Sequence, residues 1–325
     1  MKNAIRLLIF LFPLYFLSAQ TLINLKNPPT EATLFAEGFI STSMNERDFA
    51  ISSDGKEIYY TISTPESSFQ TIVFSTLGEK GWSKPEVVSF VGKFSDLEPA
   101  FSADGNKMYF ASNRPLAGNK PKDFDIWVVE RTGKTWGEPK NLGNTINTES
   151  DEFYPSITKS GNLYFTAQYK EGIGKEDIFI AQWSADHFEK PIPLDTAVNS
   201  KSYEFNAFVD PDEKFILYTG YGRKNDKGRG DLYISVKDVN GKWIPSKNLT
   251  TLNSTRLDYC PYVDPEKKIL FFTSERNTLP TSFEIKTSYK QIKKISSGTL
   301  NGTGNIYWIS FDEVMDLFQN SLKNE

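Results

Sequence analysis

The chain has 325 residues, a formal net charge of −4, 14% aromatic residues, one histidine and one cysteine. One His and one Cys are too few for a His/Cys zinc site or an internal disulfide, and a His-dependent catalytic triad would have to be built on His187 alone. The negative charge argues against nucleic-acid binding, which needs a basic surface, and the aromatic content favours β-strands.

The first twenty residues are typical of a secretory signal peptide. Lys2 and Arg6 flank the start of an apolar run at 7–17, and Ser18-Ala19-Gln20 follow it near an expected cleavage point. The run is too short for a comfortable membrane span, and no cysteine lies near it to carry a lipid anchor. We therefore expect residues 1–20 to be removed, leaving a periplasmic or secreted protein without a transmembrane span. An uncleaved N-terminal anchor is the alternative.

Residues 21–32 form an N-terminal lead, and five copies of one pattern occupy residues 33–311. Each copy begins with an acidic residue before an inner strand, and a turn such as Asp54-Gly55 or Asp104-Gly105 leads to an apolar second strand. A third strand, usually opened by a polar residue, and a short fourth segment follow. The acidic residues that mark the blade starts are Glu46, Asp96, Glu152, Glu204 and Asp258.

Four short strands repeated every 50–56 residues predict an all-β protein, a five-bladed β-propeller of four-stranded antiparallel blades, with six blades as the alternative. The fifth copy runs out after its third strand. The segment 33–41 lies where a fourth strand precedes the other acidic residues, so we expect it to complete the last blade and close the ring. Residues 278–301 are a lysine-rich insertion in that blade, and 312–325 predict a helical tail.

The second copy carries the pattern most fully. From Asp96 to Arg114 it combines Glu98-Pro99, a Phe-Ser pair, Asp104-Gly105, Tyr109-Phe110 and a final Ser-x-Arg. This pattern resembles the WD40-like (PD40) repeat of TolB-like propellers, and the resemblance covers about residues 33–311. It implies an exported bacterial propeller. Propellers of this family often have six blades, so the count of five departs from that pattern.

The acidic residues that start the inner strands are the main candidate binding residues. In a propeller they share one face near the mouth of the central channel, where a ring of carboxylates suits a cation or a basic peptide. The alternative is structural: each carboxylate caps backbone N–H groups and pairs with an arginine of a neighbouring blade. The candidates on this face are Glu46, Asp48, Asp96, Glu98, Glu152, Glu204, Asp258, Arg114 and Arg276. For Asp125, Asp177 and Asp231, which open third strands, turn capping is the simpler expectation.

These patterns predict a non-catalytic, exported scaffold that binds a protein or peptide of the bacterial cell envelope, with no catalytic residue, cofactor or metal. The alternative is a carbohydrate-active hydrolase or lyase, or a glycan-binding module, that uses carboxylates at the mouth. Recurrence of the acidic residue in all five copies disfavours the enzyme, because an acid and a base need different environments. The sequence also contains no Gly-x-Ser-x-Gly motif.

Overall fold

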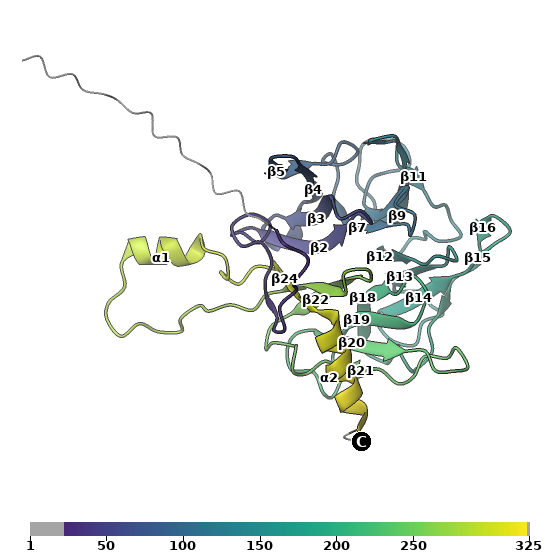
Figure 1. Ribbon diagram of the computed structural model, residues 1–325. Coiled ribbons are helices and arrows are strands. Elements are labelled where there is room, and N and C mark those ends of the chain that lie inside the picture. Colours follow the sequence, from purple (N-terminus) through teal and green to yellow (C-terminus); the bar gives the residue numbers. More distant parts are fainter. Residues whose placement is uncertain (1–22, 324–325) are drawn as a thin grey trace, which may run out of the picture.

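A computed structural model describes residues 23–323, and it contains a five-bladed β-propeller (Figure 1). Each blade is a four-stranded antiparallel sheet, as the repeat pattern predicted. The predicted signal peptide lies outside the described residues. No helix of residues 23–323 is long and apolar enough to cross a membrane.

The inner strands begin at the acidic residue of each repeat or one residue before it. Each inner strand contacts those of the two adjacent blades, so the five form a closed ring. They are β2 (Asn45–Ile51), β7 (Asp96–Phe101), β12 (Glu152–Ile157), β18 (Tyr203–Val209) and β22 (Asp258–Asp264).

Second, third and outer strands follow outward from the axis. The second strands are β3 (Glu57–Ser63), β8 (Lys107–Ser112), β13 (Leu163–Ala167), β19 (Phe215–Tyr221) and β23 (Ile269–Ser274). The third strands are β4 (Gln70–Gly78), β9 (Asp125–Thr132), β14 (Asp177–Ala181), β20 (Asp231–Val236) and β24 (Asn305–Ser310). The outer strands are β6 (Glu86–Val87), β11 (Lys140–Asn141), β17 (Ile192–Pro193), β21 (Lys247–Asn248) and β1 (Thr33–Leu34).

Short elements extend the blades at their periphery. A 3-10 turn, η1 (Pro65–Ser67), lies between β3 and β4. The strands β5 (Gly81–Trp82) and β10 (Thr135–Trp136) fold back on the ends of β4 and β9. In the third blade a separate hairpin is formed by β15 (Trp183–Ser184) and β16 (His187–Phe188).

The ring is closed by the N-terminal strand, as predicted. Thr33 and Leu34 of β1 pair with Trp308 and Tyr307 of β24, so the last blade combines the two ends of the chain. The next residue, Phe35, is 1% exposed. Its ring lies 5.3 Å from that of Phe49 in the first blade and 5.0 and 5.4 Å from Phe271 and Trp308 in the last. Aromatic packing therefore joins the first and last blades beside the β1–β24 pair.

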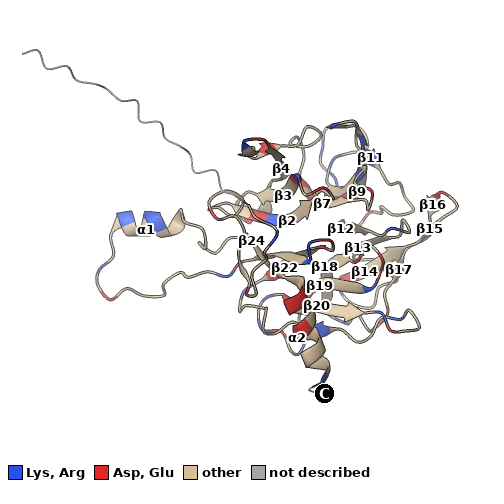
Figure 2. Ribbon diagram, viewed as in Figure 1, with Lys and Arg blue, Asp and Glu red and all other residues tan. Residues whose placement is uncertain are grey.

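Two helices belong to the last blade. Helix α1 (Tyr289–Ser296), which contains three lysines, sits on a long arm that extends away from the propeller (Figures 1 and 2). Between residues 278 and 300 of this described arm, no side chain is buried. Helix α2 (Phe311–Lys323) continues directly from β24, and its buried Phe311, Val314 and Phe318 pack in a cluster with side chains of the fourth and fifth blades.

The closure of the ring can be tested with a matched pair of phenylalanines. We expect Phe35→Ala to lower the free energy of unfolding by about 3–5 kcal/mol, because it leaves a cavity in the aromatic packing between the first and last blades. Phe283→Ala, in the exposed arm, should change it by less than about 0.5 kcal/mol. Urea denaturation followed by tryptophan fluorescence measures both, and equal effects of the two substitutions would contradict this account of closure.

Candidate functional site

The five acidic residues that begin the inner strands, here called the ring carboxylates, lie inside the blades. Glu46, Asp96, Glu152, Glu204 and Asp258 are each at most 1% exposed. Each accepts hydrogen bonds from the residue four positions earlier, so each carboxylate fixes the loop that enters its own strand. The donors are Thr42 N–H and hydroxyl, Gly92 N–H, Thr148 N–H and hydroxyl, Ser200 N–H and hydroxyl, and Ser254 N–H and hydroxyl.

Arginines bind three of the ring carboxylates. Nη2 of Arg114 lies 2.6 Å from Asp96, and Nη2 of Arg276 lies 2.8 Å from Asp258. Each guanidinium also donates a 3.0 Å hydrogen bond to a main-chain carbonyl of the segment leading from the preceding blade, at Phe90 and Leu252 respectively. Each of these arginines follows the second strand of the same blade as its carboxylate, so the expectation of a partner from a neighbouring blade is wrong. Each arginine reaches the preceding blade through its hydrogen bond to the main-chain carbonyl of Phe90 or Leu252.

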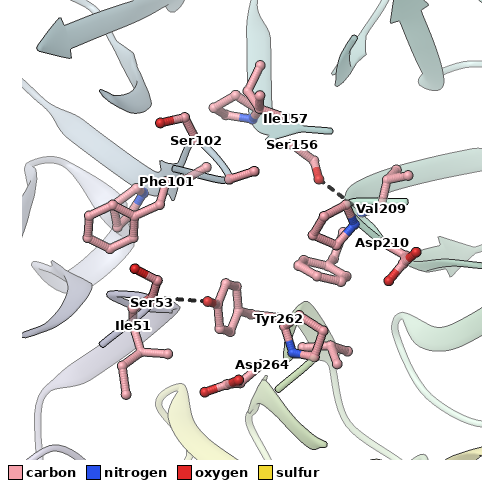
Figure 3. Close-up of a pocket in the computed structure, with 18 of the residues that line it drawn as sticks. Ile51, Ser53, Phe101, Ser102, Ser156, Ile157, Val209, Asp210, Tyr262 and Asp264 are labelled. Carbon is pink, nitrogen blue, oxygen red and sulfur yellow. Dashed lines mark hydrogen bonds between the residues drawn. The ribbon is translucent and has the colours of Figure 1, made fainter. Parts of the chain in front are cut away.

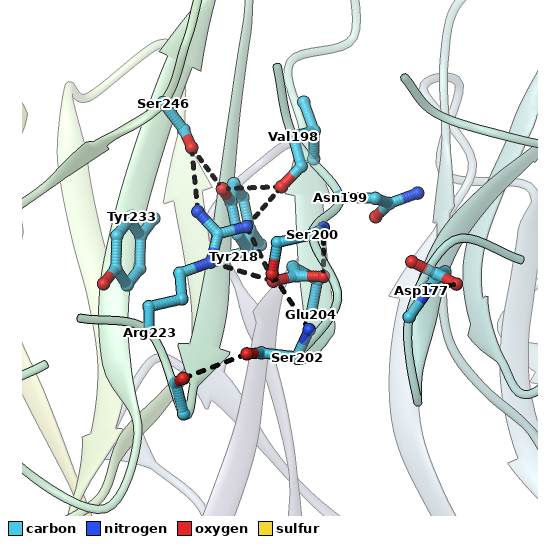
Figure 4. Close-up of polar contacts among 12 residues, drawn as sticks. Asp177, Val198, Asn199, Ser200, Ser202, Glu204, Tyr218, Arg223, Tyr233 and Ser246 are labelled. Atoms are coloured by element: carbon cyan, nitrogen blue, oxygen red, sulfur yellow. Dashed lines mark hydrogen bonds and ion pairs between the residues drawn. The ribbon is translucent and has the colours of Figure 1, made fainter. Parts of the chain in front are cut away.

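The same bridge recurs in the other blades with different residues. In the fourth blade Arg223 lies 2.7 Å from Glu204 and also donates to the carbonyl of Val198 (Figure 4). In the third blade the hydroxyl of Tyr169 takes this role, lying within hydrogen-bond distance of both Glu152, at 2.8 Å, and the carbonyl of Ile146. In the first blade Asn305 from the last blade donates to Glu46 at 3.0 Å.

The structure therefore places the ring carboxylates within the blades, with their oxygens engaged, and not on an open mouth. This corrects the expected placement; the cause is the local hydroxyl, N–H and guanidinium donors that surround each group. The acidic residues that open third strands are also buried and engaged. Asn141 and Asn248 donate to Asp125 and Asp231 at 2.7 and 2.8 Å, and two backbone N–H groups donate to Asp177.

A second set of residues meets at the propeller axis, two positions after each ring carboxylate. Here every inner strand has a β-bulge, and the residue in it adopts a left-handed backbone with φ between 51° and 62°. Non-glycine residues rarely adopt this conformation, so its fivefold repetition marks a built feature of the fold. The five are Asp48, Glu98, Tyr154, Asn206 and Cys260.

These five residues and Arg47 form a buried polar network, here called the axial cluster. Arg47 donates from Nε to Oδ1 of Asp48 at 2.8 Å and from Nη2 to Oε1 of Glu98 at 2.9 Å. Nη2 also lies 3.5 Å from the sulfur of Cys260. Asn206 donates to Oε1 of Glu98 at 3.3 Å. The guanidinium thus connects side chains of three inner strands across the axis.

Glu98 also accepts a hydrogen bond from a backbone N–H group that has no threonine hydroxyl to bind. The N–H groups of Glu98 and Asn206 donate to the hydroxyls of Thr61 and Thr166, which lie on the second strand of the preceding blade. The blade before Tyr154 has Ala111 at the corresponding position. The N–H of Tyr154 donates instead to Oε2 of Glu98 at 2.6 Å. Both oxygens of Glu98 are therefore occupied.

Burial governs the protonation of the axial cluster. Desolvation, with repulsion from Asp48, raises the pKa of Glu98 to about 8, although Arg47 and the Tyr154 N–H favour the ionised form. Desolvation and the same Asp48 charge raise the pKa of the Cys260 thiol well above its usual value. Cys260 is buried and stays a thiol at neutral pH, so it is no nucleophile.

A cavity of about 300 Å³, here called the axial pocket, opens on the face opposite the start of the inner strands. Its rim is formed by the turns between first and second strands, and Asp48, Glu98 and Tyr154 lie at its inner end. Side chains from all five blades surround it, as Figure 3 shows. One apolar residue per blade, five positions after the ring carboxylate, lines the wall: Ile51, Phe101, Ile157, Val209 and Val263.

Of the predicted site residues, Asp48 and Glu98 are the two that line this pocket, within the part of the chain that the structure describes. The sequence interpretation missed Arg47, Tyr154, Asn206 and Cys260 as members of one cluster. A signal was present, since three of them share the column two residues after the acidic position. Because these three side chains are a phenol, an amide and a thiol, the sequence did not show that they occupy the same position of the repeat.

No family model and no curated protein sequence matches the chain, so membership of the PD40 family is not shown. Solved structures do share its fold. A glycoside hydrolase is 8% identical with a TM-score of 0.52, and the match covers 87% of this chain and 92% of that one. TolB from Acinetobacter baumannii is 17% identical with a TM-score of 0.46 over 73% of this chain, which spans 50% of that protein. A putative TolB from Agrobacterium tumefaciens is 13% identical with a TM-score of 0.47, over 82% and 91% of the two chains. At these identities the likeness concerns the propeller fold alone.

The buried carboxyl groups predict a fall in stability as pH rises. Burial raises the pKa of Glu152 to about 7, against opposing hydrogen bonds from Thr148 and Tyr169. The folded state therefore binds more protons than the unfolded chain between about pH 4.5 and 7, and the free energy of unfolding decreases with pH across this window. One such group contributes a slope of at most about 1.4 kcal/mol per pH unit.

We expect Glu152→Gln to flatten the dependence of the unfolding free energy on pH, because glutamine keeps an acceptor for Thr148 and cannot ionise. Glu149→Gln, at an exposed position nearby, should leave the dependence unchanged. Urea denaturation at pH 5, 6, 7 and 8 measures both. A wild-type protein that gains stability from pH 5 to 7 would be inconsistent with this assignment.

Proposed function

We propose that this chain is an exported, non-catalytic propeller of the bacterial cell envelope whose axial pocket binds a segment of a partner protein or peptide. The observation that carries the proposal is the axial pocket itself, a cavity of about 300 Å³ with apolar walls supplied by every blade and a polar inner end. Mostly apolar concavities with a few converging polar groups are the usual form of a binding site. The signal-like N-terminus supports export to the periplasm or beyond.

The pocket suits a protruding segment better than a flat partner. Its lining combines apolar side chains with the hydroxyl groups of Ser53, Ser102 and Ser156 (Figure 3). The hydroxyl of Ser156 accepts from the N–H of Val209 at 2.9 Å, and the hydroxyl of Tyr262 donates to the carbonyl of Ile51 at 3.1 Å. These bonds link adjacent blades at the pocket wall, so the cavity is held open by the ring and costs little to order on binding.

A carbohydrate-active enzyme is the second candidate, and one observation favours it. Asp48 and Glu98 both line the pocket, and burial raises the pKa of Glu98 to about 8, as an acid–base pair would require. Against it, one guanidinium, that of Arg47, binds both carboxylates, and both oxygens of Glu98 already accept hydrogen bonds. Such engagement leaves Glu98, the group with the raised pKa, without a free oxygen from which to transfer a proton to a glycosidic oxygen. Scaffold binding therefore fits the geometry better.

Two alanine-to-tryptophan substitutions test the proposed site. Ala103→Trp places a large ring at the rim of the axial pocket, whereas Ala117→Trp places one on an exposed loop between β8 and β9, away from it. We expect wild type and Ala117→Trp to capture the same envelope protein, and Ala103→Trp to lose at least about 90% of it. The captured protein is identified by mass spectrometry, and the binding is then reproduced with that protein purified.

Equal capture by all three proteins, once each is shown to be folded by circular dichroism, would place the partner elsewhere on the molecule. A parallel incubation with envelope glycans tests the second candidate. Release of reducing ends by wild type but not by Asp48→Asn would move the assignment to a carbohydrate-active enzyme.

A further inference from the structure

We infer that the axial pocket recognises a primary ammonium group on its ligand, and that the second carboxylate oxygen of Asp48 is the acceptor at the inner end. The inference rests on the proposed function, because it names the chemistry that a segment entering this pocket carries. It concerns a lysine side chain or a free α-amino group, which share the same ammonium.

Asp48 provides the first observation. It is 2% exposed and lines the pocket, and its Oδ1 accepts the hydrogen bond from Arg47. Its other oxygen, Oδ2, is buried and accepts no hydrogen bond from an N–H or O–H group of the described residues, so the neighbouring Cys260 thiol, a weak donor, is the one group beside it. A buried carboxylate oxygen without a donor is costly, and donors are usually supplied by the protein, by water or by a ligand. Oδ2 is therefore an acceptor without a strong donor, on a residue that lines the cavity.

The charge around the pocket points to a cationic donor. Six carboxylates and one lysine occur among the described residues that line it. The lysine, Lys159, pairs with Asp212 at the rim with a distance of 2.9 Å. Although Arg47 pairs with Asp48 and Glu98, and burial raises the pKa of Glu98, carboxyl groups outnumber cations in the lining, and such a concave site favours cations over anions.

The number of free acceptors favours an ammonium over a guanidinium. Arginine binds carboxylates best through two parallel hydrogen bonds to two oxygens. At the inner end, Oδ1 of Asp48 and both oxygens of Glu98 are already occupied, which leaves Oδ2 of Asp48. A compact ammonium needs one such acceptor, and its methylene stem would contact the apolar wall at Ile51, Phe101 and Val209.

Arrival of a second cation beside Glu98 shifts its protonation. At neutral pH the burial that raises the pKa of Glu98 keeps much of the group protonated, and a nearby ammonium favours its ionised form. Binding of the ammonium therefore releases protons and strengthens from pH 6 to 8. The charged and titratable groups that act on Glu98 are Arg47 and Asp48 on β2, Tyr154 on β12, Cys260 and Tyr259 on β22, and Glu176 before β14.

Small probes of matched shape test the inference on the purified protein. We expect hexylammonium to bind at least about tenfold more tightly than hexan-1-ol by isothermal titration at pH 7.5, with hexanoate not bound. Asp48→Asn should abolish the preference for hexylammonium and retain the affinity for hexan-1-ol, which shows that the pocket is intact. Asparagine tolerates the left-handed backbone at this position and can still accept from Arg47.

Asp212→Asn is the matched control, because it removes one negative charge at the rim instead of the inner end. It should change hexylammonium affinity by less than about threefold. Two apolar peptides separate the sources of the ammonium: one has an acetylated N-terminus and a single lysine, and the other has a free N-terminus and no lysine.

Equal affinity for hexylammonium and hexan-1-ol, or a preference that survives Asp48→Asn, overturns the inference. Neither result touches the proposed function, which depends on the loss of the envelope partner in Ala103→Trp. Conversely, a partner captured equally by Ala103→Trp removes the proposed function whatever the small probes do.

Discussion

The carboxylate at the start of each inner strand is the interaction on which the ring depends. It is buried, it caps the loop that enters its own strand, and in three blades it holds an arginine that reaches the main chain leading from the preceding blade. A buried carboxylate is unfavourable alone and acceptable when every oxygen has a donor. Tyr169 and Asn305 supply a donor in the remaining two blades. The hydrogen bond to the carboxylate is therefore kept in every blade, while the residue that donates it differs.

Once the strands are held in this way, their bulges determine what lies at the axis. A left-handed residue two positions along each inner strand brings Asp48, Glu98, Tyr154, Asn206 and Cys260 together. One guanidinium joins three of them. The axial cluster closes the inner end of the pocket, and the apolar column five positions along forms its wall. The same period of the repeat therefore produces both the polar end and the apolar sides of the candidate site.

The fold alone does not separate a scaffold from an enzyme. A glycoside hydrolase at 8% identity shares the propeller fold, and at that identity the likeness says nothing about activity. What separates the two functions is the state of the carboxylates at the pocket. Glu98 has N–H donors on both oxygens, whereas Asp48 keeps one oxygen without an N–H or O–H donor in the described structure. That asymmetry suits recognition of a charged group better than a two-carboxylate reaction.

The fold could be predicted from the amino-acid sequence: the repeat length, the five acidic starts and the missing fourth strand of the last copy predicted a five-bladed ring closed by the N-terminal strand, now β1. Those features are local and periodic, so the pattern of residues was enough. The site depended on tertiary structure. Whether Glu46 or Glu98 faces a cavity depends on where the bulge places each residue and, for Glu98, on donors from other blades. The five side chains at the bulge position differ so much in chemistry that their common location could not be recognised from the sequence. Asp48 and Glu98 were predicted as candidates, but Arg47 and Cys260 became their neighbours only when the ring closed, because strands distant in sequence meet at the axis.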